Sequence, residues 1–590
     1  MRLKKYLIIL IIFLIYLFSG IYIVSKFRSL PSPIYGGDLW YQHGVVQHIL
    51  SGGNPLESSS IRDAVPGYLP VYALIVASFA KFFRLEALKA MILLSPFFLA
   101  FAFLLWYVCL NCIFKRCDVA LLGSVFAINF GFILKYTDFA RLWVLPVFGL
   151  LLYKWFKHTN LRNMLFLSIV YGILPLVHMV LFIGATITLA IFFLVKFIEF
   201  KKEKKFKSFL LMGVIFVFVS GSLALLYWYK PLFIHKLHIA YDRTHIDIPD
   251  FGRADVAFKF IWTTIKSIFL NFGGFKQSIS TIFCLIGLVS FLFMLNKRSD
   301  LYRFMRLFLI SALVSTFSYF ITEPLLGMNF IPHYMRSFTL FFGIVLLQAL
   351  GISFVLSQFK KKKVRVSFFC GMLVLLLSAG YVDAASALSE NRFYKNAFAP
   401  LPPAYAALKD WILANTDVND VFISTKELSF MLNSLTGRKL LTNRWAHQND
   451  PYTNMPERDL IAALILYGDN VEKKLELIKR YDVKYLYWDS YWINSEYQDR
   501  KFEYMYDPLI VLDSPKNRKI LSNNGVKFKP MYFWVDPSSR RKDVRRFNVL
   551  IITPENYFNE THPWKPDLDR YLEKVWSYNN EAVIYRIKCG

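Results

Sequence analysis

Charged residues are scarce in this chain, where Asp, Glu, Lys and Arg together make up only 19% of 590 residues. Hydrophobic residues account for 56%, and the mean hydropathy is +0.39. A soluble protein of this length does not carry so many long apolar runs. Composition and run length together exclude an ordinary soluble protein and predict a polytopic α-helical membrane protein.

Cysteine is also rare, with six in the whole chain. Five lie in or beside apolar runs and only Cys589 belongs to the carboxyl-terminal part, so that part cannot hold an internal disulfide. Cys109 and Cys112 form a CxxC at the end of an apolar run, without the polar flanks of a zinc or redox site. We interpret this pair as packing residues.

Acidic residues are few relative to basic ones, 41 against 69, which gives a formal charge of +28. The basic residues cluster in short loops between apolar runs, at 115–116, 201–207, 297–298 and 360–365. This is the positive-inside pattern of membrane proteins, with a contribution expected from anionic lipid headgroups. The lipid bilayer is therefore the expected partner of this charge, and nucleic acid is not.

Eleven membrane-spanning helices are predicted, most of them near the ~20 residues that crossing needs. The first, Met1–Ser25, has basic residues before its apolar run but no convincing small-residue cleavage site, so we expect an uncleaved helix and not a signal peptide. The others are 87–114, 118–135, 142–157, 163–177, 179–197, 208–229, 277–296, 305–322, 335–358 and 367–385. Every strongly basic loop then lies inside, with the amino end cytoplasmic and the carboxyl end extracytoplasmic.

This layout predicts a multi-pass domain over residues 1–385, with long outer loops at 27–86 and 230–276. The first loop ends in an amphipathic stretch, Tyr68–Phe83, that we expect along the membrane interface. The second carries a His-rich stretch that is either an interfacial belt or a substrate lid. Residues 386–590 have the composition of a soluble protein and alternate helical with strand-like stretches, which predicts an outward-facing α/β domain.

Asp38 follows Gly36 and Gly37 just after the first predicted span. An acid at a membrane exit, beside glycines that allow close approach to a ligand, suits a metal ligand or a catalytic base. The alternatives are a solvated loop acid and a helix N-cap, because a helix could begin right at Asp38.

Asp138 lies in a short outer segment between two apolar runs, where a charge is costly unless it is paired or used. It is a candidate metal ligand, and Arg141 is a secondary site candidate. An equally simple interpretation pairs the two across i,i+3 at the start of the next helix.

Glu323 ends one predicted span, and Arg336 opens the next. Glu323 is a candidate metal ligand, and Arg336 is a candidate to hold a phosphate or diphosphate. The plainer alternatives are a helix-end Glu and a snorkelling Arg. His43 and His333 are secondary candidates.

The order of these residues resembles the GT-C class of membrane glycosyltransferases, and most closely the catalytic subunit of oligosaccharyltransferase. In that family an Asp follows the first span in a long outer loop that closes with a Tyr-Pro-containing amphipathic helix, as Asp38 and Tyr68–Pro70 do here. A second acidic motif and a late Ser/Thr-x-Glu-like element match Asp138 and Ile321–Pro324, and a downstream family arginine matches Arg336.

The resemblance implies transfer of a sugar or oligosaccharide from a polyprenyl-phosphate or -diphosphate carrier to a lipid, glycan or protein acceptor outside the membrane. It implies Asp38 as catalytic base or acceptor-orienting residue and Arg336 as the ligand of the donor phosphate. It also implies Asp138 and Glu323 as ligands of a divalent metal, Mg or Mn.

Three departures from the family pattern are visible, the first being eleven predicted spans where the family usually has thirteen. Phe139-Ala140-Arg141 follows Asp138 where the family usually has a second acid, and the Trp-Trp-Asp-Tyr-Gly element that reads an asparagine sequon is missing from the tail. In the region of the tail comparable to that element, this chain has residues 441–450, which could bind a ligand.

Two other classes of function stay open. A non-catalytic scaffold or assembly subunit is favoured by the missing acid, and a lipid-linked saccharide transporter is disfavoured because the acids lie at span ends.

Overall fold

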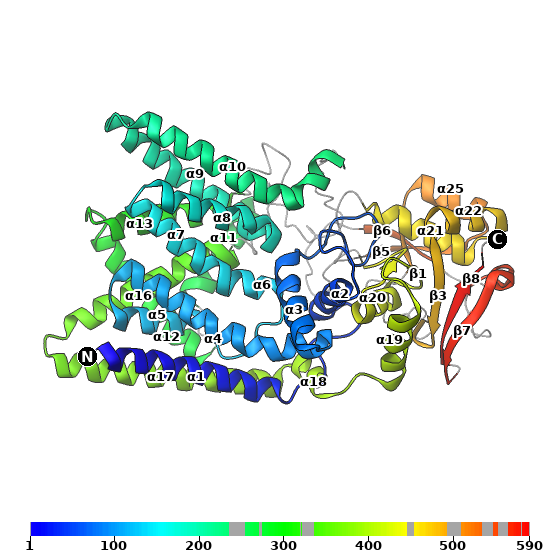
Figure 1. Cartoon of the computed structure of the whole chain (residues 1–590), viewed down its shortest axis with the longest axis horizontal. Helices are drawn as coiled ribbons and strands as arrows, with labels where there is room; N and C mark the ends of the chain where they lie inside the picture. The colour runs from blue at the N-terminus through cyan, green and yellow to red at the C-terminus, as the bar shows by residue number, and fades with distance from the viewer. Residues whose placement is uncertain are drawn as a thin grey trace. The chain divides into compact units, whose positions relative to one another are not determined.

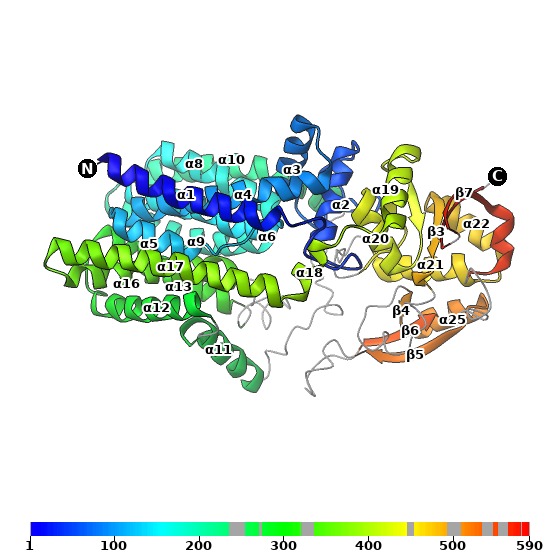
Figure 2. The same ribbon diagram turned by 90° about the horizontal axis from the view of Figure 1, so that it is seen from below.

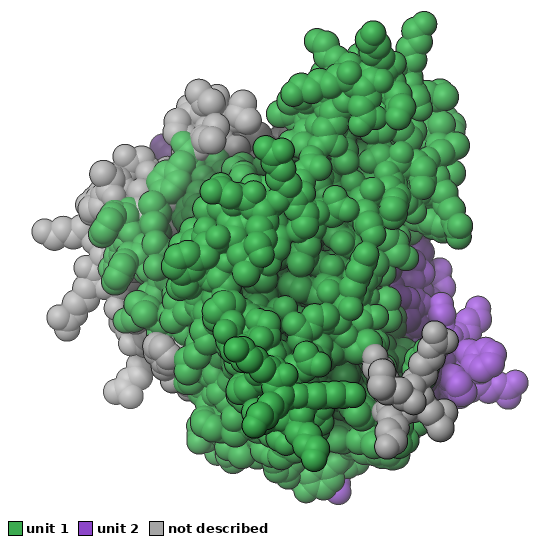
Figure 3. Space-filling model, turned by 90° about the vertical axis from the view of Figure 1, so that its left-hand side faces the viewer, with its two compact units in different colours: residues 1–27, 91–229, 250–395 green, residues 28–90, 230–249, 396–590 purple. Residues whose placement is uncertain are grey.

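The computed structural model describes residues 2–234, 254–270, 274–318, 320, 336–444, 453–492, 509–533, 547–552, 564–579 and 581–588. The chain forms two compact units, which Figure 3 colours separately. Unit 1 comprises residues 1–27, 91–229 and 250–395, and unit 2 comprises residues 28–90, 230–249 and 396–590. Most of the first predicted outer loop therefore shares a compact unit with the carboxyl-terminal region.

Unit 1 is built from helices, which Figures 1 and 2 show from two directions. Among the described residues, the helices and π-helical turns that lie wholly or mostly in unit 1 are α1 (Arg2–Val24), α4 (Ala87–Phe114), α5 (Cys117–Ala127), α6 (Tyr136–Phe139), η1 (Ala140–Val144), α7 (Leu145–Lys157), α8 (Leu161–Val177), α9 (Met179–Lys202), α10 (Phe206–Tyr229), α11 (Ala254–Phe269), α12 (Phe275–Phe293), α13 (Asp300–Phe317), η3 (Arg336–Leu340), α16 (Phe341–Gln358), α17 (Lys362–Glu390) and α18 (Arg392–Phe398). A further π-helical turn, η2 (Lys230–Ile234), follows α10.

In the described part of the chain, eight helical stretches are long and apolar enough to cross a membrane. They are Tyr6–Val24, Ala87–Phe114, Tyr136–Lys157, Met179–Lys202, Phe206–Ile234, Phe275–Phe293, Arg336–Gln358 and Lys362–Glu390. Each of the eleven predicted spans contains a described helix, which confirms the polytopic helical class. The three helices that fall short are α5 with 11 residues, α8 with 17, and α13, which carries Asp300, Arg303 and Arg306.

The predicted span 118–135 is wrong in its second half, because α5 ends at Ala127. The next carbonyl, that of Ile128, accepts hydrogen bonds from the Tyr16 hydroxyl at 3.0 Å and from Lys276 Nζ at 2.5 Å. Non-helical backbone within a membrane domain is tolerated where protein groups satisfy it in this way. The two donors belong to α1 and α12, which lie far from the break in sequence.

Helices α12 and α16 cross at very close range. A Cβ added to Gly287 would lie 1.8 Å from the carbonyl oxygen of Leu347, and one added to Gly351 would lie 2.3 Å from that of Phe283. Small residues let helix backbones approach in this manner. The crossing fixes α16 and with it the turn η3 that precedes it.

Unit 2 contains two β-sheets in its described residues. The larger has the order β2-β1-β3-β8-β7, and the smaller, antiparallel one has the order β4-β6-β5. β1 pairs in parallel with β2 and β3, whereas β8 pairs antiparallel with β3 and β7. The strands are β1 (Val421–Ile423), β2 (Lys439–Leu440), β3 (Val483–Asp489), β4 (Ile510–Leu512), β5 (Phe528–Phe533), β6 (Phe547–Ile552), β7 (Leu572–Tyr578) and β8 (Ala582–Ile587).

The helices of unit 2 come from both ends of the sequence: α2 (Asp38–Leu50), α3 (Pro70–Phe83), α19 (Pro403–Asn415), α20 (Lys426–Thr436), α21 (Met455–Tyr467), α22 (Val471–Arg480) and α25 (Pro515–Asn523). α2 packs closely on α20, beside which Figure 1 shows it. A Cβ on Gly44 would lie 2.7 Å from the carbonyl oxygen of Asn433. The mixed α/β character predicted for the carboxyl-terminal region is confirmed, and α3 confirms the helical stretch expected near its position.

Candidate functional site

Asp138 and Arg141 form an ion pair in unit 1. Arg141 Nη2 donates to Asp138 Oδ1 at 3.0 Å across i,i+3, and the two side chains are 38% and 37% exposed. The Arg141 guanidinium also lies over the ring of Phe341, 5.5 Å from its centroid. This ion pair is the alternative to a metal-binding role for Asp138 that the i,i+3 spacing predicts. Pairs with this exposure contribute about 0–1 kcal/mol to stability.

Arg336 opens the π-helical turn η3, and its Nη1 donates to Ser267 Oγ of α11 at 2.9 Å. Arg141 lies in a turn of the same kind, η1. π-helical turns within α-helices are frequent at functional sites. A guanidinium has five N–H donors, and the Ser267 contact uses one of them.

An aromatic stack joins the segments that carry these residues. The ring of His178, which lies between α8 and α9, stacks on the ring of Tyr136 with centroids 5.1 Å apart. The same imidazole lies 4.4 Å from the ring of Phe338, centroid to centroid. Tyr136 is two residues before Asp138, and Phe338 is two residues after Arg336. The stack therefore brings the two candidate segments to the same end of unit 1.

Two helical stretches begin at this end of unit 1, at Tyr136 and Met179, and a third has Arg336 as its first described residue. The amino end of a helix carries a partial positive charge and presents backbone N–H groups that bind anions. Arg336 adds a full positive charge, whereas the charge of Arg141 is balanced by that of Asp138. Positive charge of this kind attracts anionic groups.

Glu323 and His333 lie outside the described residues, as do the histidines of the second predicted outer loop, His235, His238 and His245. Within the described residues, no group of three His, Cys, Asp or Glu side chains is placed to hold a metal ion. Of the two candidate metal ligands only Asp138 is described, and Arg141 pairs with it. One carboxylate that already has a cationic partner does not make up the oxygen-rich ligand set of Mg²⁺.

Asp38 is the first residue of α2, in unit 2. Gly37 occupies the N-cap position, so Asp38 is an acid of the first helical turn and not the N-cap. The turn before it is held by the buried Trp40, whose indole N–H donates to the carbonyl oxygen of Ser32 at 3.1 Å. A carboxylate in the first turn is stabilised by the helix dipole.

His43 lies one turn further along α2, on the face that packs against α20. It is 3% exposed, and its Nδ1 lies 2.6 Å from the carbonyl oxygen of Ser434, to which the protonated nitrogen donates. Burial lowers its pKa to about 4. His48 is buried in the same way, with Nδ1 2.9 Å from the carbonyl oxygen of Gly437 and a pKa lowered to about 4 by burial.

Residues that follow the parallel strands meet the segment just before Asp38. Arg444, which follows β2, donates from Nη1 to the carbonyl oxygen of Tyr35 at 3.1 Å. Tyr491, which follows β3, stacks on Tyr35 with ring centroids 4.0 Å apart and an interplanar angle of 2°. The hydroxyls of Tyr35 and Tyr405 are also in contact. The carboxyl ends of parallel strands are where open α/β sheets place their ligands.

Asp489 ends β3 at this carboxyl edge and is 4% exposed. Its carboxylate accepts from the Tyr487 hydroxyl at 2.6 Å and from Tyr491 N at 2.9 Å. Burial raises the pKa of Asp489 to about 6. Tyr35, Asp489 and Tyr491 were not predicted as site residues, because their shared position depends on which strands are parallel and adjacent.

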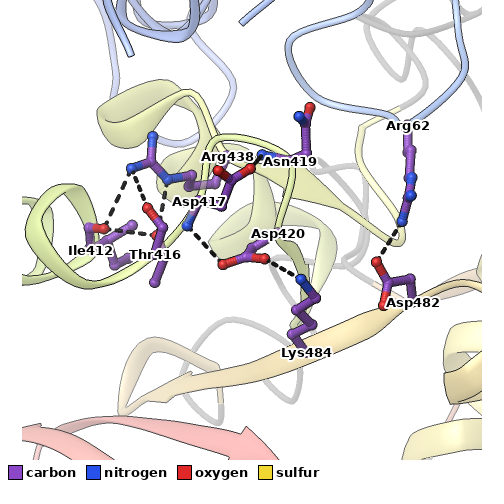
Figure 4. Close-up of polar contacts among 9 residues, drawn as sticks. All are labelled: Arg62, Ile412, Thr416, Asp417, Asn419, Asp420, Arg438, Asp482 and Lys484. Carbon is purple, nitrogen blue, oxygen red and sulfur yellow. Dashed lines mark hydrogen bonds and ion pairs between the residues drawn. The ribbon is translucent and has the colours of Figure 1, made fainter. Parts of the chain in front are cut away.

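The opposite, amino edge of the same sheet is closed by protein contacts (Figure 4). Arg438 donates to the hydroxyl and the carbonyl oxygen of Thr416, each at 2.9 Å. Lys484 pairs with Asp420 at 2.7 Å, and Arg62 pairs with Asp482 at 2.5 Å. These contacts tie helix, strand and loop together, which is a structural role.

No family model matches the chain. An uncharacterized protein of Methanocaldococcus jannaschii, MJ1080, is 41% identical over 127 residues, which cover 94% of that protein and 21% of this chain. The chain belongs to the MJ1080 family. Because MJ1080 is uncharacterized, membership assigns no activity.

Solved structures give two further likenesses. Archaeal oligosaccharyltransferase AglB from Archaeoglobus fulgidus, in complex with an inhibitory peptide and a dolichol-phosphate, is similar over 94% of this chain and 77% of its own. The two are 13% identical, with a TM-score of 0.47. ArnT from Cupriavidus metallidurans is similar over 94% of this chain and 100% of its own, with 12% identity and a TM-score of 0.41. TM-scores below 0.5 carry no conclusion about activity.

Proposed function

We propose that this MJ1080-family protein is a membrane glycosyltransferase that moves a sugar or oligosaccharide from a polyprenyl-phosphate or -diphosphate carrier to an acceptor outside the membrane. The observation that carries the proposal is the convergence at one end of unit 1. Arg336 and the helix amino ends at Tyr136 and Met179 supply there the positive charge that a leaving phosphate requires, close to the Asp138–Arg141 pair. The lipid carrier fits an integral membrane protein.

In the proposed reaction the acceptor's nucleophilic atom attacks the anomeric carbon of the donor sugar. The bond from that carbon to the phosphate oxygen breaks, and the phosphate leaves with the bonding electrons. Asp38 takes the proton that the acceptor loses, and Arg336 neutralises charge on the leaving phosphate. Asp138 and Glu323 remain proposed ligands of a Mg²⁺ or Mn²⁺ ion, which would supply further phosphate neutralisation. No step above depends on that ion.

The second candidate is a non-catalytic scaffold or assembly subunit, and the Asp138–Arg141 ion pair favours it. Asp138 and Arg141 are three residues apart at the start of a helix. This spacing is expected of an acid whose role is to stabilise its own helix. A scaffold would show no sugar transfer, whatever the donor.

The experiment is a transfer assay on the purified full-length protein in liposomes. Donors are polyprenyl-phosphate monosaccharides and polyprenyl-diphosphate oligosaccharides, with a membrane extract as the source of acceptors. The readout is the free carrier phosphate released from labelled donor. The proposal predicts protein-dependent release with at least one donor, together with label on an acceptor. Absence of release across the donor panel from folded protein would favour the scaffold.

A further inference from the structure

We propose that Arg444 is the positioning residue for Asp38, and that it acts by holding the backbone of the turn from which Asp38 starts. This inference rests on the proposed function, because it gives Arg444 a role in the same transfer reaction. Arg444 belongs to the stretch 441–450, which the sequence analysis singled out without assigning a role.

The contact is made through backbone and not through a side chain of the turn. Arg444 Nη1 donates to the carbonyl oxygen of Tyr35, three residues before Asp38. The arginine is 9% exposed, so its guanidinium is largely shielded from water. A charged donor within a protein interior makes a stronger hydrogen bond than a neutral one.

The Arg444 guanidinium packs so closely on the turn before Asp38 that the residue at position 36 must be glycine. Gly36 has a φ of +89°, a conformation that L side chains rarely adopt, and a Cβ on it would lie 1.1 Å from Arg444 Nη1. Glycine at this position therefore allows the bend and leaves room for the guanidinium. A Cβ on Gly37 would lie 1.9 Å from Ser32 Oγ, so the next residue is equally confined.

The other side of the guanidinium is also packed. Its central carbon lies over the ring of Phe430 in α20, 6.0 Å from the centroid. Arg444 is thus placed between α20 and the Tyr35–Gly36 peptide, both in unit 2. The planar fork of arginine suits stacking and hydrogen bonding at once, which the single ammonium of lysine does not reproduce. A displacement of about 1 Å at a reacting group can cost on the order of 10²-fold in rate, so control of this turn matters.

The first test needs no activity. Hydrogen–deuterium exchange of the full-length protein in detergent is compared for wild type, Arg444→Gln and Arg438→Gln. Arg438 is the matched control, because it is a buried arginine of the same unit that bonds backbone at the opposite sheet edge (Figure 4). The inference predicts faster exchange over residues 32–41 in Arg444→Gln and not in Arg438→Gln. Equal exchange over that segment in all three proteins would overturn it.

The second test uses the transfer assay in a double-mutant cycle. Arg444→Gln is expected to lower kcat about tenfold at unchanged donor KM, and Arg444→Lys to recover part of that loss. In an Asp38→Asn background, Arg444→Gln should cause no further loss, because a positioning residue acts through the group it positions. An equal loss in both backgrounds would show that Arg444 does not act through Asp38.

The two tests separate the inference from the proposed function. If Asp38→Asn retains full transfer, the assignment of Asp38 as base fails, while the exchange data still decide whether Arg444 holds the turn. If exchange is unaffected and Asp38→Asn abolishes transfer, Arg444 is not the positioning residue and the proposed function stands.

Discussion

Asp38 and Asp138 are both acids of a first helical turn, yet they are held by very different parts of the chain. Asp138 pairs with Arg141, only three residues away, and this contact could be anticipated from sequence spacing alone. The turn before Asp38 is contacted by Arg444, 409 residues from the Tyr35 carbonyl that it bonds. A local pair stabilises its own helix, whereas a turn fixed by distant residues can hold a side chain for a purpose beyond the helix. The comparison therefore favours Asp38 as the reacting carboxylate.

The largest effect is expected from Asp38→Asn, which keeps the shape of the side chain but removes the base. Loss of a general base typically costs 10²–10⁴-fold, so we expect transfer to fall by at least about 10²-fold. The measurement is the initial rate of carrier-phosphate release, with the melting temperature as the control for folding. A loss under about threefold in folded protein would end the case for Asp38 as base.

Arg336→Gln should come next in size. Removing a guanidinium that neutralises the donor phosphate is expected to lower kcat/KM for the donor by about 10–100-fold, and Arg336→Lys by less, because lysine keeps the charge without the fork. Arg116→Gln is the matched control, since Arg116 pairs with Asp118 at 2.8 Å elsewhere in unit 1. If both variants behave alike, Arg336 has no special relation to the donor.

Asp138→Asn should have a smaller effect than Asp38→Asn, about tenfold or less, because Arg141 already pairs with this carboxylate. The change in stability should stay within about 1 kcal/mol, as for other partly exposed pairs. Parallel rate and melting measurements on Asp138→Asn, Arg141→Gln and the double variant give the coupling between the two residues. A rate loss as deep as that of Asp38→Asn would overturn the ranking of the two acids.

The smallest effect is a pH dependence of the stability of unit 2. The pKa values of His43 and His48 are lowered by burial from 6.5 to about 4, so between these pH values the folded state binds fewer protons than the unfolded state. The free energy of unfolding should therefore fall as the pH drops from 6.5 towards 4, by about 1.4 kcal/mol per histidine for each pH unit crossed.

This dependence is measured from the exchange rates of α2 and α20 in full-length protein, corrected for the intrinsic effect of pH. His43→Asn keeps an N–H donor for Ser434 but does not titrate, so it should lessen the acid sensitivity of α2. Equal acid sensitivity of α2 in wild type and variant would contradict the stated origin.

Much of the helical architecture could be predicted from apolar runs, because a membrane-spanning helix satisfies its own backbone and so depends mainly on local sequence. The predicted helix bounds are wrong where residues distant in sequence contact the backbone or where a polar segment is helical. α5 ends at Ala127, and Tyr16 and Lys276 satisfy the carbonyl of Ile128 beyond it. The helical stretch that contains α7 begins at Tyr136, six residues before the predicted start, since the polar segment around Asp138 is itself helical.

The candidate site was predicted as a set of single residues, without their surroundings. The spacing of Asp138 and Arg141 predicted a pair that the structure contains, because both partners lie on one helical turn. The stacking of His178 between Tyr136 and Phe338 could not be read from sequence, since three segments meet there. The contacts of Arg444 and Tyr491 with Tyr35 could not be predicted from sequence either, because they depend on the order of the strands in the sheet.

The most direct test of the account is an experimental structure of the full-length protein with polyprenyl phosphate bound in a lipid nanodisc. The quantity to measure is the distance from the Asp38 carboxylate to the bound phosphate. The account predicts that the phosphate contacts Arg336 and that the Asp38 carboxylate lies within roughly 10 Å of it, which leaves room for one sugar. A phosphate bound away from Arg336, or an Asp38 carboxylate turned to a separate face, would contradict it.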